Sequence, residues 1–348
     1  MEETSPPDGL EERSPDWHLT KFIQFTSFKN KVGEPSPHLA MVGYMAKDKD
    51  KHTTAWMLGC YAASYCLPTA QVMWSNWDYA RVVSEPGKFL NWLKNNWKGI
   101  VTRQERRCVR TSEKMHRCLH GYAVWLDSKF DSLYDADSKS SEEYYDYVWD
   151  SVCSVPFIGR YIGIRLVEGL RRFCGVQAHL YDVRSMGGWS PKKALVFLYP
   201  KEQKWLLSNT PEANTRADEI AADLLSKVKA RLPYVNYYVL AGMLCEYREA
   251  FERRHQYPAW TIDQEPLLYD KVRSYWQDDL DMKLFWSTRK ALFPREALGE
   301  LDNGWYGTRW AAAKTLRDYG YNWSDLLYNY KAMESSGDFS ERVWRDEK

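Results

Sequence analysis

Residues 154–165 constrain the fold of this chain most, because a proline and a glycine interrupt two helical segments within a few positions. The segment is Ser-Val-Pro-Phe-Ile-Gly-Arg-Tyr-Ile-Gly-Ile-Arg. Pro156 cannot continue a helix that runs in over residues 144–153, so that helix must stop there. Gly159 permits a tight turn and carries a bare backbone N–H. The next helix begins at once, and we therefore expect two helices joined by a short hairpin.

The start of the second helix is predicted to bind an anion. The first N–H groups of a helix have no partner within it, and the helix dipole makes this end positive. Arg160 and Arg165 add charge beside it. An ordinary helical turn ended by proline is the alternative. We favour a grip on DNA backbone phosphates, with Phe157 and Gly159 at the contact, because proline, glycine and helix start coincide.

Residues 155–160, Val-Pro-Phe-Ile-Gly-Arg, resemble the Leu-Pro-Gly-Val-Gly-Arg hairpin of helix-hairpin-helix DNA glycosylases. Phe157 stands at the first glycine of that pattern. Tyr161 stands where bifunctional glycosylases have a lysine, so Schiff-base chemistry is not expected there. In that superfamily a catalytic aspartate follows the hairpin helix and a short loop, and the carboxylate at the matching place is Asp182.

The tryptophan-rich body, the segment Phe-Thr-Ser-Phe at residues 25–28 and residues 157–162 together resemble a phage family. This family is the α-glutamyl/putrescinyl-thymine pyrophosphorylases, which includes amino acid:DNA transferases. The resemblance covers most of residues 17–330. It implies a glycosylase-like fold and an enzyme that replaces a pyrophosphate on the 5-methyl carbon of hypermodified thymine with an amine such as glycine. The implied partners are double-stranded DNA carrying modified thymine and a small amine or amino acid, in the host cytoplasm.

The pattern of the whole chain predicts an all-α, or nearly all-α, protein. Only residues 194–199 resemble a strand, between two prolines. The glycosylase-like arrangement implies two helical lobes with a ligand cleft between them, near the hairpin. We expect one helical domain over residues 17–333, with the helix-hairpin-helix at about 144–173. Helices are further predicted, from apolar periodicity, at residues 38–46, 53–67, 86–97, 217–232, 234–254, 266–276, 280–292 and 309–328.

Composition limits the remaining classes of function. Residues 1–16 hold six acids and one base and are predicted to be a disordered tail, and residues 334–348 a loose one. The net charge of +1 argues against a non-specific coat on DNA. Seven cysteines without a C-x-x-C pair indicate a reducing compartment and no zinc site. The most apolar run, residues 55–67, is too short to cross a membrane.

No metal or organic cofactor is expected. The chain lacks a Walker loop and a Gly-x-Gly-x-x-Gly segment after a strand, and no His, Cys or Asp cluster has metal-ligand spacing. The one bound ion that the helix-hairpin-helix motif allows is a cation held by the backbone of the hairpin. The enzyme is therefore expected to use a pyrophosphate already attached to DNA.

Asp182 and His179 are the predicted catalytic residues. Asp182 could stabilise positive charge at the reacting carbon, orient the amine or take its proton, or it could instead cap the turn before residues 186–188. His179, three residues earlier, could relay a proton or be a plain loop residue. Arg160, Arg165 and Arg184 are predicted to bind the pyrophosphate.

A second arginine cluster, in residues 102–110, is predicted to contact backbone phosphates. Arg106, Arg107 and Arg110 are its candidates, and a solvated helix face is the alternative. Two functions besides the transferase stay open: a base-excision glycosylase that uses the same hairpin and Asp182, and a helical DNA-binding protein without catalytic activity.

Overall fold

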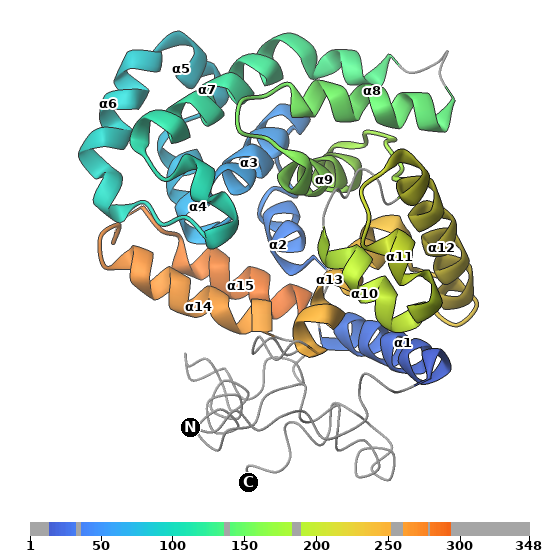
Figure 1. The fold of residues 1–348 in the computed structure, drawn as a ribbon. Coiled ribbons are helices and arrows are strands. Elements are labelled where there is room, and N and C mark those ends of the chain that lie inside the picture. Colours follow the sequence, from blue (N-terminus) through green and yellow to red (C-terminus); the bar gives the residue numbers. More distant parts are fainter. Residues whose placement is uncertain are drawn as a thin grey trace, which may run out of the picture. The chain divides into compact units, whose positions relative to one another are not determined.

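A computed structural model describes residues 14–32, 36–135, 140–182, 189–251, 260–277 and 279–293 of the 348-residue chain. Every regular element in these ranges is a helix, and none of them contains a strand, which confirms the all-α prediction (Figure 1). The chain divides into two compact units. The first comprises Met1–Ser36, Asp182–Asp263 and Phe293–Lys348, and the second comprises Pro37–Tyr181 and Gln264–Leu292.

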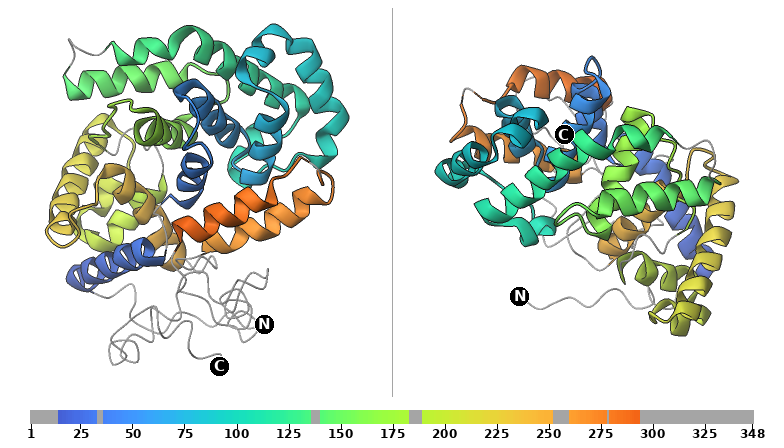
Figure 2. Two further views of the ribbon diagram at one scale, coloured as in Figure 1. Left: turned by 180° about the vertical axis from the view of Figure 1, so that it is seen from behind. Right: turned by 90° about the horizontal axis from the view of Figure 1, so that it is seen from above.

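The second unit contains the predicted hairpin and a closely packed helical core. Gly59 of α3 and Gly169 of α9 make the close packing possible: an added Cβ would lie 2.0 Å from the Tyr122 ring at Gly59 and 2.8 Å from the Leu58 side chain at Gly169. Helices α8 and α9 lie side by side, as the views in Figure 2 also show. The helices of this unit are α2 (Pro37–Met45), α3 (Lys51–Ser64), α4 (Leu67–Asn76), α5 (Tyr79–Ser84), α6 (Pro86–Asn96), α7 (Ser112–Lys129), α8 (Ser141–Cys153), α9 (Arg160–Gly169), α14 (Trp260–Arg273, from Gln264 on) and α15 (Met282–Leu292), with short turns η1 (Trp97–Gly99), η2 (Gln104–Val109), η3 (Asp131–Tyr134) and η4 (Leu170–Cys174).

The apolar run predicted as one helix over residues 53–67 is two elements. Tyr65 ends α3 in the left-handed region, at φ 53°, and Leu67 begins α4. Pro68 lies in the first turn of α4, where its missing N–H would have no helical partner anyway. The proline therefore starts a helix here, and the sequence prediction, which treated it as a stop, missed α4.

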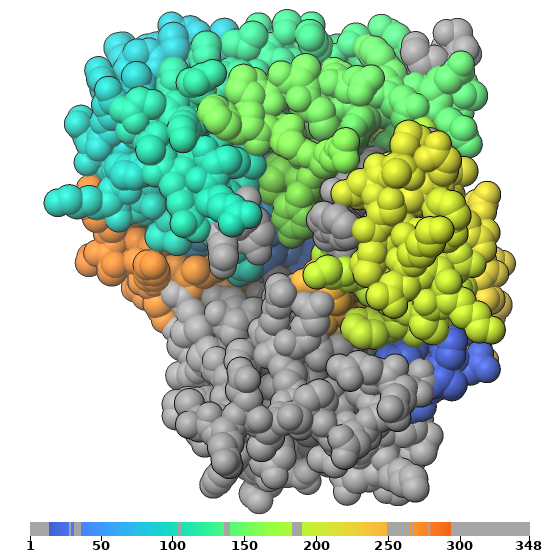
Figure 3. Space-filling model, viewed as in Figure 1, coloured from blue at the N-terminus to red at the C-terminus, as the bar shows by residue number. Residues whose placement is uncertain are grey.

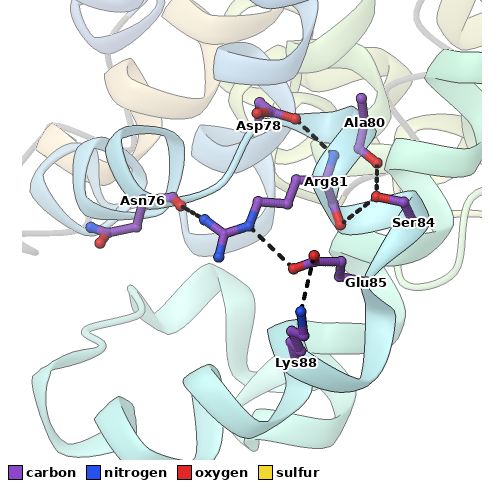
Figure 4. Close-up of polar contacts among 7 residues, drawn as sticks. All are labelled: Asn76, Asp78, Ala80, Arg81, Ser84, Glu85 and Lys88. Carbon is purple, nitrogen blue, oxygen red and sulfur yellow. Dashed lines mark hydrogen bonds and ion pairs between the residues drawn. The ribbon is translucent and has the colours of Figure 1, made fainter.

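Short polar contacts connect α4, α5 and α6 (Figure 4). The Asp78 carboxylate caps α5 by accepting a hydrogen bond from the Arg81 N–H at 2.7 Å. The Arg81 guanidinium donates to the Asn76 carbonyl at 3.3 Å and pairs with Glu85 at 3.4 Å. Glu85 in turn pairs with Lys88 at 3.1 Å. These contacts are exposed and fix local chain direction more than they add stability.

The first unit is also helical, and it corrects the predicted strand. Residues 194–198 belong to α10, residue 199 follows its end, and Ala194, Leu195 and Leu198 are buried at helical spacing. A short apolar run has no period that separates a strand from a buried helix, and Pro191 is tolerated in the first turn of α10. The helices of this unit are α1 (Pro15–Val32), α10 (Trp189–Leu198), η5 (Pro200–Glu202), α11 (Gln203–Leu206), α12 (Pro211–Lys229) and α13 (Tyr237–Phe251).

Candidate functional site

The helix-hairpin-helix forms between α8 and α9, as its sequence predicts. Helix α8 begins with a capping box in which the Ser140 and Glu143 side chains bond each other's backbone N–H. It ends at Cys153, three residues before Pro156. The Ile158 N–H then donates to the Val155 carbonyl at 3.1 Å, which closes a four-residue turn.

The residue that makes this turn possible is Phe157 rather than Gly159. Phe157 has φ +64°, while Gly159 has φ −91° and ψ 179°, an extended conformation that any residue adopts. Proline at the second position and a positive φ at the third are the features of a type II turn, in which the third position favours glycine. The prediction that Gly159 supplies the turn's unusual backbone is therefore wrong, and Phe157 carries the strain instead.

Gly159 is the N-cap of α9 and is open to solvent. Its carbonyl accepts the N–H of Gly163 at 2.8 Å, and no side chain caps the helix start. A Cβ added to Gly159 would meet no protein atom within 4 Å. The N–H groups of the first turn of α9 therefore face an open surface beside the exposed Arg160. The green region around residues 141–165 lies on the surface in Figure 3.

The hairpin is held from inside the second unit by Arg106. This side chain is 1% exposed, and its guanidinium donates to the carbonyls of Phe157, at 2.9 Å, and Ala63, at 3.0 Å. Arg117 lies over the Phe157 ring, 5.3 Å from its centroid. Burial leaves Arg106 no surface for a phosphate, so the predicted DNA contact by this residue is corrected to a structural role.

The other predicted arginines occupy different environments. Arg107, Arg110 and Arg160 are exposed, so each can reach an external phosphate. Arg165 pairs with the buried Glu168 of the same helix, Nη1 to Oε2, at 3.1 Å. This pairing competes with the predicted contact to pyrophosphate. Arg184 lies outside the described residues.

The two predicted catalytic residues follow the end of η4. His179 is exposed, whereas Asp182 is buried, with 7% of its surface accessible. Asp182 follows Tyr181, whose hydroxyl donates to both carboxylate oxygens of Asp146 at 2.9 and 3.0 Å. Burial raises the pKa of Tyr237, and the carboxylates of Asp218 and Asp182 raise it further. The Asp182 carboxylate is therefore one of the charges that keep the Tyr237 hydroxyl protonated.

A buried polar cluster in the second unit was missed by the sequence predictions. His38 of α2 forms an ion pair with Glu265 of α14 through Nε2, and the two side chains are 7% and 1% exposed. Arg103 donates to the same Glu265 oxygen at 2.9 Å. Burial alone would raise the pKa of Glu265, but the contact with His38 and the charges of Arg103 and Arg289 outweigh it and hold the pKa below its ordinary value. Glu265 is thus ionised at neutral pH.

Tyrosine side chains connect this cluster to the hairpin. The rings of Tyr61 and Tyr65 lie 5.7 and 6.5 Å from the His38 ring. The Tyr65 hydroxyl lies 3.0 Å from that of Tyr161, the second residue of α9, which is 43% exposed. His38 and Glu265 come from opposite ends of the sequence, so no motif spacing could have indicated the pair.

Comparison with protein families gave a decisive match. The family described as amino acid:DNA transferase matches residues 37–257, which is more than half of the chain. The chain belongs to the amino acid:DNA transferase family. Searches of curated proteins and of solved structures gave no match.

Membership of the amino acid:DNA transferase family makes the protein an enzyme that acts on DNA as a transferase. The matched region holds the hairpin, His38 and Asp182. Within the described ranges, no group of three or more His, Cys, Asp or Glu side chains is arranged to hold a metal. None of the described helices has the length and hydropathy of a membrane span.

Proposed function

We propose that this amino acid:DNA transferase acts on thymine hypermodified in bacteriophage DNA. In the proposed reaction an amine or amino acid, such as glycine, displaces pyrophosphate from 5-pyrophosphoryloxymethyl-uracil. The observation that carries the proposal is the hairpin: an open helix start at Gly159, fixed from inside by Arg106, in a chain of this family. Replacing thymine in this way would protect phage DNA from restriction in the host cytoplasm.

The hairpin suits one phosphate of the DNA backbone. No side chain caps the start of α9, the positive end of its dipole lies at the exposed Gly159, and the exposed Arg160 adds a full charge. Arg107 and Arg110 offer further contacts of the same kind. Such contacts set affinity and salt dependence but carry no sequence information. The protein would thus hold DNA in one orientation and find the modified base by its 5-substituent.

The chemistry needs two kinds of charge. The amine nitrogen bonds to the methylene carbon on C5 while the carbon–oxygen bond breaks, and the electron pair leaves on the pyrophosphate. A guanidinium such as that of Arg160 would stabilise the leaving group. The carboxylate of Asp182 would stabilise the electron-poor carbon or orient the amine. Flipping the base out of the duplex would expose the reacting carbon to the amine.

A labelled-amine assay tests the proposal. The full-length protein is incubated with duplex DNA that carries 5-pyrophosphoryloxymethyl-uracil and with radiolabelled glycine or other labelled amines. Label on the base, together with one pyrophosphate released per label, supports the transferase. Abasic sites would instead show a base-excision glycosylase, and a gel shift with neither product would show a DNA-binding protein without this activity. Duplex with unmodified thymine is the control that must stay unlabelled.

A further inference from the structure

In its neutral form, His38 has the arrangement of an oriented base beside the Glu265 carboxylate. Glu265 holds the imidazole through Nε2, which fixes both the ring orientation and the proton on that nitrogen. The other ring nitrogen, Nδ1, makes no hydrogen bond to any described residue. An ionised carboxylate on one side of an imidazole stabilises the positive charge that forms when the other nitrogen takes a proton.

The neighbouring titratable groups are poor proton acceptors at neutral pH. Burial raises the pKa of Tyr61 well above its usual range, so this hydroxyl stays protonated. Burial also raises the pKa of the Cys66 thiol to about 11. Glu265 stays ionised beside the Arg103 and Arg289 guanidiniums, and its Oε1 already accepts a hydrogen bond from Arg103. The ionisable groups near His38 come from several elements. They are Tyr61 of α3, Tyr65 at the end of α3, Tyr161 of α9, Glu265 of α14, Arg103 just before η2 and Arg289 of α15.

The cluster also reaches the surface at the hairpin. Tyr65 touches both His38 and Tyr161, and Tyr161 follows Arg160 directly in α9. Tyr65 is held in the left-handed region at φ 53°, a conformation that costs a non-glycine residue energy and is enriched at functional sites. A phosphate held at Gly159 would therefore place DNA beside an aromatic pair on which a base can stack.

We propose that His38 is the catalytic base of the transfer, with Glu265 as its positioning residue and the Tyr65–Tyr161 pair as an aromatic wall for the modified base. This assignment rests on the proposed transferase function. As the amine attacks, its nitrogen becomes positively charged, and the carbon–oxygen electrons leave on pyrophosphate. Nδ1 of His38 takes the proton from this nitrogen, Glu265 stabilises the imidazolium, and the proton then passes to water.

Single-turnover transfer of labelled glycine by His38→Gln tests the assignment. We expect the rate to fall by about a hundredfold or more while DNA affinity stays within a few-fold, since a general base contributes about 10²–10⁴. Added imidazole should restore part of the rate in His38→Gly. Wild-type rates should show an ionisation in their pH profile that the His38→Gln profile lacks. Glu265→Gln should reduce the transfer rate less than His38→Gln does. Added imidazole should not restore its rate, because His38 is still present in this variant.

A matched control comes from a surface pair of the same unit. His52 lies 3.3 Å from Asp131 in an exposed histidine–carboxylate pair, and His52→Gln should transfer at the parental rate. A folded His38→Gln protein that transfers glycine at the parental rate, with an unchanged pH profile, would overturn the assignment and leave a purely structural ion pair.

Two further outcomes keep the test decisive. If no His38 variant folds, carbethoxylation of the wild-type protein is mapped by mass spectrometry. Modification of His38 in step with loss of transfer supports the proposal, and transfer lost while His38 stays unmodified overturns it. A wild-type protein that transfers no amine refutes the proposed function itself, whereas an active His38→Gln variant refutes only the role of His38.

Discussion

Replacing Gly159 by alanine or valine separates folding from DNA binding at the hairpin. Gly159 has φ −91°, and an added Cβ would meet no protein atom within 4 Å. The substitution therefore removes no contact and requires no strained backbone. Because alanine and valine are poorer N-cap residues than glycine, we expect the free energy of unfolding to fall by about 1 kcal/mol or less, which corresponds to a melting-temperature shift of about 2–4 °C or less.

The effect on DNA binding should be far larger. A hydrogen bond between a backbone N–H and a charged phosphate contributes about 1.5–3 kcal/mol. A Cβ at Gly159 would push the phosphate away from the N–H groups of α9, so affinity should fall roughly 10- to 100-fold. Valine should weaken binding more than alanine. Modified and unmodified duplexes should lose affinity equally, because a backbone contact does not read the base.

Fluorescence anisotropy at fixed ionic strength measures the effect. The matched control is Gly87, an exposed glycine in the first turn of α6 where an added Cβ would also meet nothing within 4 Å. Its alanine and valine variants should bind like the parent. A Gly159→Val protein with parental melting temperature and parental affinity for both duplexes would refute the phosphate contact and leave the hairpin as a structural turn.

Four further changes test other parts of the structure. Arg160→Ala should reduce the slope of log affinity against log salt by about one phosphate, and an unchanged slope would remove this side chain from the interface. Asp182→Asn should lower single-turnover transfer roughly a hundredfold with DNA affinity within a few-fold, and near-normal transfer would exclude a catalytic role. Arg106→Met leaves two buried carbonyls without donors and should lower the free energy of unfolding by about 3 kcal/mol, measured by urea denaturation, while a neutral result would contradict the anchoring role. Glu265→Gln should lower the melting temperature most near neutral pH: the folded-state pKa of Glu265 is depressed, so its stabilisation is complete above the ordinary carboxyl pKa and is lost as pH falls through the lower folded-state pKa, where the gap to the wild type should shrink. A gap that is independent of pH would contradict the depressed pKa.

Local signals in the sequence predicted the elements that local chemistry determines. The stop of α8 before Pro156 and the start of α9 follow from proline and glycine, whereas the capping box at the start of α8 was not predicted. Residues 194–199 were mispredicted because a short apolar run lacks a period, and tertiary burial then selects the helix. Phe157 was not recognised as the left-handed residue, because the Arg106 side chain that bonds its carbonyl comes from a distant part of the chain.

The candidate site was harder to predict than the fold, since its side chains meet only after folding. Arg106 has the same sequence context as Arg107, yet one is buried and the other exposed. A short 3₁₀ turn, η2, decides which of the two neighbours points inward. His38 and Glu265 carry no local signal of each other, because their pairing depends on how α2 and α14 pack.

The start of α9 carries both the proposed phosphate contact and the proposed stacking surface for the base, so the helix fixes the distance between them. Gly159 is exposed and no side chain caps the helix there, while Arg106 holds the preceding turn from within through the Phe157 carbonyl. Two residues further on, the exposed Tyr161 contacts Tyr65, which contacts His38. Because one helix turn carries both features, a phosphate bound at Gly159 fixes where a base can stack on the tyrosines. Because the buried Arg106 side chain anchors the hairpin from within, the outer surface of the hairpin stays free for DNA.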